Sequence, residues 1–129
     1  GDLTESHIAW QTTRSAPNTP SMIVVDGALY FVSDGGILTC ADPQDGSVHW
    51  SERLGGNYSA SPIAVGDHIY FVSEEGVVSV LKATEKEFKV ISKNDLKERS
   101  LASPAAFGNV LLLRTNDHLW KITSTFKKQ

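Results

Sequence analysis

The stretch LYFVSDGGILT, residues 29–39, returns forty positions later as IYFVSEEGVVS, residues 69–79. A third and weaker copy follows at a spacing of forty-two, where the Ser-Pro pair at residues 61–62 aligns with the Ser-Pro pair at residues 103–104. Self-similarity at a fixed period of roughly 20–50 residues indicates a repeat architecture, in which each unit is one small supersecondary element. The sequence therefore predicts three related units in this chain.

Each copy has the pattern of short strands separated by tight turns. In the first copy the runs MIVV, LYFVS, ILTC and SVHW are separated by turns that contain glycine, such as residues 26–27 and 34–36. Glycine adopts the positive φ of such turns at little cost. Four short strands in a unit of about forty residues are typical of a β-propeller blade.

The second run of the first two units indicates how the strands are buried. LYFV and IYFV are apolar without a break, whereas a sheet with one face in water alternates apolar and polar residues. A blade inside a propeller is covered on both faces by its neighbours, so its inner strands are expected to be apolar throughout. The outer runs HIAW and SVHW alternate instead. We therefore expect an all-β fold made of β-propeller blades, each a sheet of four antiparallel strands.

Composition and charge exclude several functional classes. The chain has 129 residues, a net charge of -3 and no basic patch, so neither nucleic acid nor an anionic membrane is an expected partner. No apolar run reaches the roughly 20 residues that span a bilayer, and the first ten residues lack the pattern of a signal peptide. The single cysteine, Cys40, rules out an internal disulfide and a cysteine-rich metal site.

Two longer phrases carry a family resemblance. Residues 40–50, CADPQDGSVHW, resemble the A-x-D-x-x-T-G-x-x-x-W phrase of pyrroloquinoline-quinone-type propeller repeats. Residues 61–71, SPIAVGDHIYF, resemble the S-S-P-x-V-x-D-G-x-V-Y-F phrase of the same family. The resemblance implies that Asp42 and Gly46 shape the turn into the outer strand and that Trp50 docks on the neighbouring blade.

The chain also departs from the family pattern. Cys40 stands where the family has another small residue, and Asp45 stands for a threonine. In the second copy, residues 82–90 contain no turn glycine and no tryptophan, so we expect an irregular turn there and a weaker dock on the next blade. Residues 14–21, 34–40 and 52–62 resemble C-terminal parts of exported bacterial proteins in this group, which implies a periplasmic or extracellular location.

The copies add up to about three blades' worth of sheet in a single domain, residues 1–129. We expect the outer strand of an incomplete blade, two blades, and the inner strands of a last blade at residues 6–13, 20–54, 60–92 and 102–124. Propellers usually have about four to eight blades, so the first and last blades are each expected to expose an apolar face. A homodimer that closes a six-bladed ring by exchange of residues 6–13 would cover both faces. Alternatively, the remaining blades belong to a longer chain.

The sequence offers no catalytic or metal site. A quinone dehydrogenase of the resembling kind needs adjacent cysteines, a calcium-binding Glu/Asn/Asp set and a catalytic aspartate, and one cysteine excludes the adjacent pair. The histidines lack the spacing of metal ligands; they are His7, His49, His68 and His118. We therefore expect no catalytic residue, no cofactor and no metal in this chain.

Binding residues are expected on one rim of the propeller. The loop from each outer strand to the next blade lies on this rim, together with the hairpin between the second and third strands, and loops on a rigid scaffold commonly carry binding residues. The connecting loops are residues 14–20, 54–60 and 93–102, and their candidate partner-binding residues are Arg14, Asn18, Asn57, Tyr58, Asn94 and Arg99.

These observations lead to two functional hypotheses. The first is a non-catalytic binding or scaffold module whose rim loops contact a protein, a peptide or a carbohydrate. The alternative is a structural fragment of a larger exported quinoprotein-like enzyme whose active site lies outside this chain. The absence of a catalytic constellation in the sequence favours the first.

Overall fold

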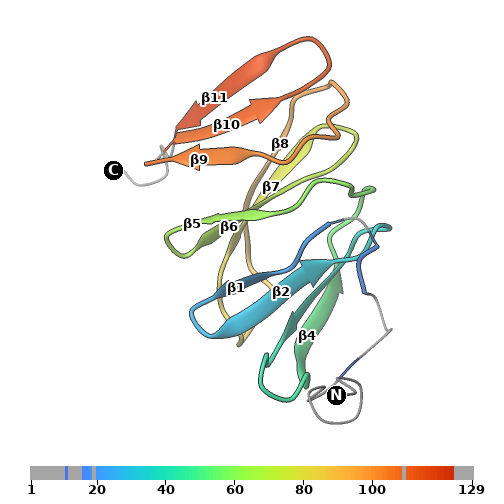
Figure 1. The fold of residues 1–129 in the computed structure, drawn as a ribbon, viewed down its shortest axis with the longest axis vertical. Coiled ribbons are helices and arrows are strands. Elements are labelled where there is room, and N and C mark those ends of the chain that lie inside the picture. The colour runs from blue at the N-terminus through green and yellow to red at the C-terminus, as the bar shows by residue number, and fades with distance from the viewer. Residues whose placement is uncertain (1–10, 12–15, 19, 109, 124–129) are drawn as a thin grey trace, which may run out of the picture.

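The computed structural model describes Gln11 and residues 16–18, 20–108 and 110–123. These residues form eleven strands in three antiparallel sheets (Figure 1). None of them lies in a helix, so the described part of the chain has no helix that would reach across a membrane. The first sheet has the order β1-β2-β3-β4, and its strands are β1 (Ile23–Val25), β2 (Ala28–Val32), β3 (Ile37–Ala41) and β4 (Val48–Arg53).

The second and third sheets repeat this order. The second sheet contains β5 (Ile63–Val65), β6 (His68–Val72), β7 (Val77–Lys82) and β8 (Val90–Asp95). The third sheet contains β9 (Ala105–Phe107), β10 (Val110–Arg114) and β11 (Leu119–Thr123). The expected strand at residues 6–13 lies outside the described residues.

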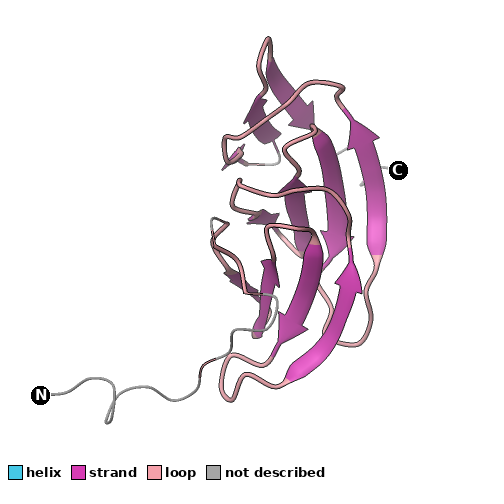
Figure 2. Cartoon of the chain, turned by 90° about the vertical axis from the view of Figure 1, so that its right-hand side faces the viewer, coloured by secondary structure: helices cyan, strands magenta, loops and turns pink. Residues whose placement is uncertain are grey.

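The three sheets are stacked one on another (Figure 1). The short first strands β1, β5 and β9 lie along one side of the stack, and the outer strands β4 and β8 lie along the opposite side (Figure 2). This arrangement confirms the predicted fold class, a set of propeller blades made of antiparallel strands. The described sheets do not close into a ring.

The repeat in the sequence is also a repeat in strand register. Ile23 pairs with Tyr30 in the first sheet, and Ile63 pairs with Tyr70 in the second. The pairing of the third and fourth strands shifts after Cys40 in the first sheet and after Val80, forty residues later, in the second. Equivalent residues therefore occupy equivalent places in both sheets. The second sheet also extends to Asp95, beyond the expected limit at residue 92, because β8 pairs with β7 along its whole length.

The core lies between the sheets. Every residue of β2 is buried, as its unbroken apolar sequence predicts, and successive side chains point to opposite faces of the sheet. Tyr30 and Val32 enter a cluster with Ile69 and Phe71 of the second sheet. A second cluster joins the second and third sheets in the same way, and its buried members are Tyr70, Val72, Val78, Val80, Leu111 and Leu113. Burial of each large side chain contributes about 2 kcal/mol to folding.

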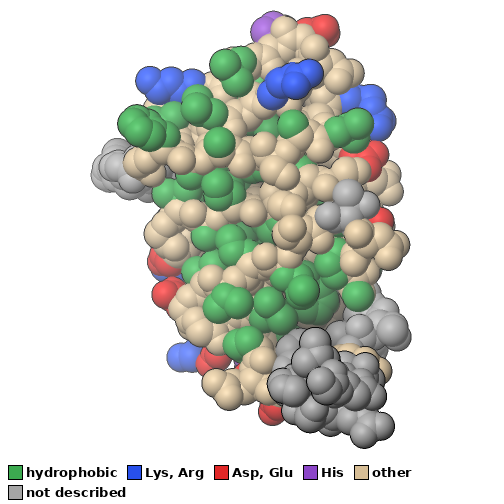
Figure 3. Space-filling model, viewed as in Figure 1, with side chains coloured by type: hydrophobic (Ala, Val, Ile, Leu, Met, Phe, Trp, Pro, Cys, Tyr) green, Lys and Arg blue, Asp and Glu red, His purple; other side chains and the backbone are tan. Residues whose placement is uncertain are grey.

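Apolar residues are exposed at one end of the stack. Phe107 and Leu119 of the third sheet are 78% and 74% exposed, which confirms the expectation of an open face on the last blade. The same expectation is wrong for the first blade, where Leu29, Phe31 and Ala41 are only 8%, 4% and 2% exposed. Figure 3 shows that apolar side chains also gather on the side that carries β1, β5 and β9, where Met22 is exposed.

The first and second sheets are further joined by a tryptophan. The indole Nε1–H of Trp50 donates to the carbonyl oxygen of Thr84 at 2.9 Å, and its ring packs edge-on against Phe88 at 5.5 Å between centroids. The turn before β4 is closed by Asp42 and Gly46, whose φ is 76°. Both roles implied by the family resemblance are therefore present.

Candidate functional site

The predicted rim is built by loops that cross the hairpin of the preceding sheet. Between the first and second sheets, the N–H of Tyr58 donates to the carbonyl of Asp34 at 2.9 Å, and the N–H of Glu74 donates to the carbonyl of Asn57 at 2.7 Å. Between the second and third sheets, the N–H of Ser100 donates to the carbonyl of Glu74 at 3.0 Å. Backbone hydrogen bonds thus hold the rim loops in place before any partner binds.

Two of the candidate residues pair with the hairpin of the second sheet. The amide Nδ2 of Asn57 donates to Oε2 of Glu75 at 2.9 Å, and the backbone N–H of Asn57 donates to Oε1 at 3.2 Å. These hydrogen bonds hold the pKa of Glu75 below its ordinary value, since they stabilise the ionised form. Arg99 reaches the neighbouring Glu74 at 3.3 Å and keeps an exposed side chain. The structure therefore brings Asn57 and Arg99 to one hairpin.

Asn18, Asn94 and Arg14 do not join this group. The backbone N–H of Asn18 donates to the carboxylate of Asp34 at 2.8 Å, one sheet away. Asn94 lies within β8, opposite Val78, and not in the predicted loop, because β8 continues to pair past it. Arg14 lies outside the described residues.

Tyr58 is placed differently from the prediction. We expected it to contact a partner on the surface, but its side chain is only 2% exposed and belongs to the core cluster between the first and second sheets. Burial of the ring raises the pKa of Tyr58 to about 12, and the negative charge of Glu75 acts in the same direction. The hydroxyl group is protonated at neutral pH and forms a hydrogen bond with the hydroxyl of Ser79.

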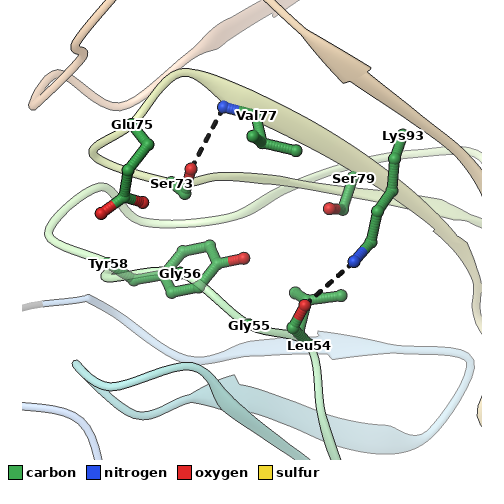
Figure 4. A pocket seen from close by; sticks show the side chains of 9 residues that line it. All are labelled: Leu54, Gly55, Gly56, Tyr58, Ser73, Glu75, Val77, Ser79 and Lys93. Carbon is green, nitrogen blue, oxygen red and sulfur yellow. Dashed lines mark hydrogen bonds between the residues drawn. The ribbon is translucent and has the colours of Figure 1, made fainter.

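A pocket of 390 Å³ lies beside Tyr58, where the loop after β4 meets the second sheet. Figure 4 shows side chains from this loop, from the hairpin between β6 and β7, and from β7 and β8 around it. The lining residues are Leu54, Gly55, Gly56, Tyr58, Ser73, Glu75, Val77, Ser79 and Lys93.

Backbone geometry keeps the pocket open. The N–H groups of Leu54 and Gly55 donate to the carbonyl of Gly36 at 2.8 and 3.1 Å, which fixes the loop on the hairpin of the first sheet. Gly56 has a φ of 86°, and a β-carbon there would lie 3.1 Å from both Ser73 and Glu75. A side chain at this position would be strained and would fill the space.

The polar groups of the pocket are divided between its two ends. In Figure 4 the hydroxyls of Tyr58 and Ser79 and the ammonium of Lys93 point toward one end, and the carboxylate of Glu75 lies at the other. Lys93 donates to the carbonyl oxygen of Leu54 at 3.0 Å. Within the described ranges, no carboxylate lies close enough to Lys93 to form an ion pair.

Several of these residues were not selected from the sequence. Lys93 falls inside the expected loop range 93–102, and Glu75 lies in the turn of the second copy that is equivalent to residues 34–36. Ser79 was the easiest to find, because it interrupts an apolar third strand at the same place where Thr39 interrupts the equivalent strand forty residues earlier. In the described parts of the chain, no group of three or more His, Cys, Asp or Glu side chains is arranged to hold a metal ion.

Comparison with known proteins gives one family match. The family model described as outer membrane protein assembly factor BamB matches residues 3–124. No curated protein matches the chain significantly.

Solved structures show the same fold at low sequence identity. BamB from Moraxella catarrhalis has a TM-score of 0.66 at 17% identity, over 84% of this chain and 33% of that protein. A europium-containing methanol dehydrogenase has a TM-score of 0.65 at 15% identity, over 81% of this chain and 22% of the enzyme. A quinohemoprotein alcohol dehydrogenase from Pseudomonas putida HK5 has a TM-score of 0.59 at 14% identity, over 74% of this chain and 16% of the enzyme. This chain thus spans a third or less of each.

Proposed function

We propose that this chain, which belongs to the family of the outer membrane protein assembly factor BamB, is a non-catalytic propeller module that binds a protein partner through its rim. The match over most of the chain confirms the resemblance to pyrroloquinoline-quinone-type propeller repeats. The observation that carries the proposal is the rim itself, where backbone hydrogen bonds fix the loops and an open pocket lies between them.

A rim of this kind is suited to protein recognition. Its loops are already ordered, so binding costs less conformational entropy than it would for free loops. Arg99 and the hairpin carboxylates of Glu74 and Glu75 present both charges within a small area. The printed name of the matched family, an assembly factor, agrees with a role in contacting other proteins.

The same family name and the likeness to BamB support a location in the cell envelope, periplasmic or extracellular, as part of this proposal.

The second candidate function is a structural part of a larger quinoprotein-like enzyme. The likeness to a methanol dehydrogenase, of which this chain would span 22%, favours it. In that case the reacting groups lie in other blades, and this chain supplies only part of the propeller that surrounds them.

The outer face of the third sheet is open, whereas the equivalent faces of the first and second sheets are each covered by the next sheet. Phe107, Leu112 and Leu119 are exposed there, whereas the equivalent faces of the other sheets are buried. We propose that further blades cover it, from a second copy or from a longer chain. A dimer by light scattering at micromolar concentration supports the second copy, and a clean monomer refutes it.

Site-directed photocrosslinking in the native host tests the rim. A photoreactive residue at Arg99, on the rim, is compared with one at Gln44, in the exposed turn at the opposite end of the first sheet. A crosslinked protein obtained at position 99 and not at position 44 supports the proposal. Equal crosslinking at both, together with a quinone absorbance change on titration of the purified chain, favours the enzyme part.

A further inference from the structure

The geometry points to a specific ligand for the pocket between the first and second sheets: we propose that it binds a carboxylate group of the protein partner, with Lys93, Tyr58 and Ser79 as donors. This inference rests on the proposed function, because it names the chemical group by which the partner is held at the rim. The carboxylate belongs either to a C-terminus or to an acidic side chain, and both sources have the same chemistry.

The size of the pocket limits what can enter. At 390 Å³ it lies at the lower end of the range of about 300–1,000 Å³ found for small-ligand sites. One side chain or the last residue of a peptide fits such a space. A folded segment does not, so the partner would insert a single anchoring group while the rest of it contacts the rim.

Lys93 supplies the positive charge. Its ammonium group carries three N–H donors, and the hydrogen bond to Leu54 uses one of them. None of the described carboxylates forms an ion pair with it. An entering carboxylate would therefore form a charge-assisted hydrogen bond without displacing an existing ion pair.

Two neutral donors lie at the same end of the pocket. The hydroxyls of Tyr58 and Ser79 point toward the region of the Lys93 ammonium (Figure 4). The two hydroxyls are hydrogen-bonded to each other, so together they keep one free O–H for a ligand. A carboxylate only accepts hydrogen bonds, so it matches the free O–H of this hydroxyl pair and the Lys93 ammonium better than an amide or a cation does.

The remaining walls fit the rest of the anchoring group. Leu54, Val77 and the ring of Tyr58 form an apolar lining that suits an aliphatic stem. At the far end, Glu75 is held by Asn57 through two hydrogen bonds. Its negative charge would repel the carboxylate toward Lys93 and favour the peptide N–H groups next to it.

The test uses the purified chain and three labelled hexapeptides. The first ends in a free carboxylate after an apolar residue, the second is the same peptide as a C-terminal amide, and the third is the amide with one internal glutamate. Binding is measured by fluorescence anisotropy, and amide shifts of the pocket residues are followed by NMR.

Lys93→Met and Lys89→Met form the matched pair of variants, because Lys89 is exposed and lies outside the pocket. Loss of a charge-assisted hydrogen bond should weaken binding about 10-fold or more in Lys93→Met. Binding by Lys89→Met should stay within about twofold. Tyr58→Phe, checked for its melting temperature, should weaken binding about threefold, since it removes one neutral donor.

The pattern of binding identifies the source of the carboxylate. Binding of the first peptide alone indicates a C-terminus, and equal binding of the third indicates an acidic side chain. The inference would be overturned if neither the first nor the third peptide bound. It would also be overturned if the NMR amide shifts fell outside the pocket residues, or if Lys93→Met and Lys89→Met bound the peptide with equal affinity. The crosslink at position 99, repeated in Lys93→Met, shows separately whether the rim still binds its partner.

Discussion

The junction between the first and second sheets and the junction between the second and third sheets have the same backbone frame but different side chains. At the first junction Trp50 lies between the sheets, bonded to Thr84 and packed on Phe88, and its ring is 6.1 Å from that of Tyr30. This junction also contains the larger apolar cluster, with twelve buried residues against six at the second.

At the second junction a carboxylate joins the sheets on the rim, where the loop after β8 crosses the hairpin between β10 and β11. Glu98 accepts hydrogen bonds from the hydroxyl of Thr115, from the backbone N–H of Asp117 at 3.2 Å and from the ring of His118. The indole of Trp120 donates to Thr115 at 2.8 Å and stays within its own sheet. The hydrogen bonds of Glu98 with Thr115, Asp117 and His118 form a polar latch on the rim, at the opposite end of the sheets from the contact of Trp50 with Thr84. The weaker dock expected from the loss of the tryptophan phrase in the second copy stays a prediction.

Repetition therefore specifies the backbone geometry of this chain more strictly than its side-chain chemistry. Gly36 and Gly76 occupy the same turn, each with a φ above 90°, because the loop to the next sheet passes directly over it. In the third sheet the aligned residue is His118, which has no positive φ among those recorded for the described residues.

The largest effect is expected from Gly76→Ala. The new β-carbon would collide with the carbonyl oxygen of Glu98, more severely than in Gly36→Ala, where Gly56 O lies 2.6 Å away. Strain of about 1–3 kcal/mol from the positive φ and a similar amount from the overlap predict a loss of about 4 kcal/mol. Urea unfolding measures it, with Gly35→Ala as control, because Gly35 has open space around it. If Gly76→Ala lowered the free energy of unfolding less than Gly36→Ala does, the loop at the second junction would shift more easily than the loop at the first.

A smaller loss is expected from Trp50→Ala. Removal of a large aromatic side chain costs about 3–5 kcal/mol in a full core, and the partial exposure of Trp50 places the loss near 3 kcal/mol. Trp50→Phe keeps the packing and removes the bond to Thr84, which predicts about 1 kcal/mol. Thermal unfolding of both variants separates packing from hydrogen bonding. A similar loss in the two would contradict the packing role.

The smallest effect is a pH dependence at the second junction. The hydrogen bond from the hydroxyl of Thr115 holds the pKa of Glu98 below its ordinary value of 4.5, and the hydrogen bonds from the backbone N–H of Asp117 and the ring of His118 act in the same direction. Because the folded pKa is the lower one, the stabilisation is complete above pH 4.5 and is lost as the pH falls through the folded value. The melting temperature of the chain should therefore fall more steeply below pH 4.5 than that of Glu98→Gln.

The control for this measurement is Glu87→Gln, at an exposed position outside the latch. Other carboxylates with lowered pKa values, such as Asp67, contribute to the acid slope of all three proteins, so the difference between the two variants isolates Glu98. If the melting temperatures of Glu98→Gln and Glu87→Gln fell in parallel as the pH decreased, Glu98 would not contribute to the stability of the latch.

Much of the fold was predictable from the sequence because each strand carries its own signal. The turn glycines and the unbroken apolar run of β2 depend on residues close together in the chain, and so does the tryptophan phrase that ends at Trp50. The site was predictable only in its location. Asn57 and Arg99 do lie on the rim, but the inward position of Tyr58 and the strand position of Asn94 were missed.

The sequence by itself determined the number of strands in each described sheet, their order and the forty-residue spacing of equivalent positions, since local turn and apolar patterns repeat with that period. Only the tertiary structure decided which side chains meet at the rim. Asn57 meets Glu75 because the loop after β4 reaches the hairpin of the second sheet, and Lys93 of β8 meets Leu54 because the same loop begins beside that outer strand. Such contacts join residues 18 and 39 positions apart, and no local pattern in the chain records them.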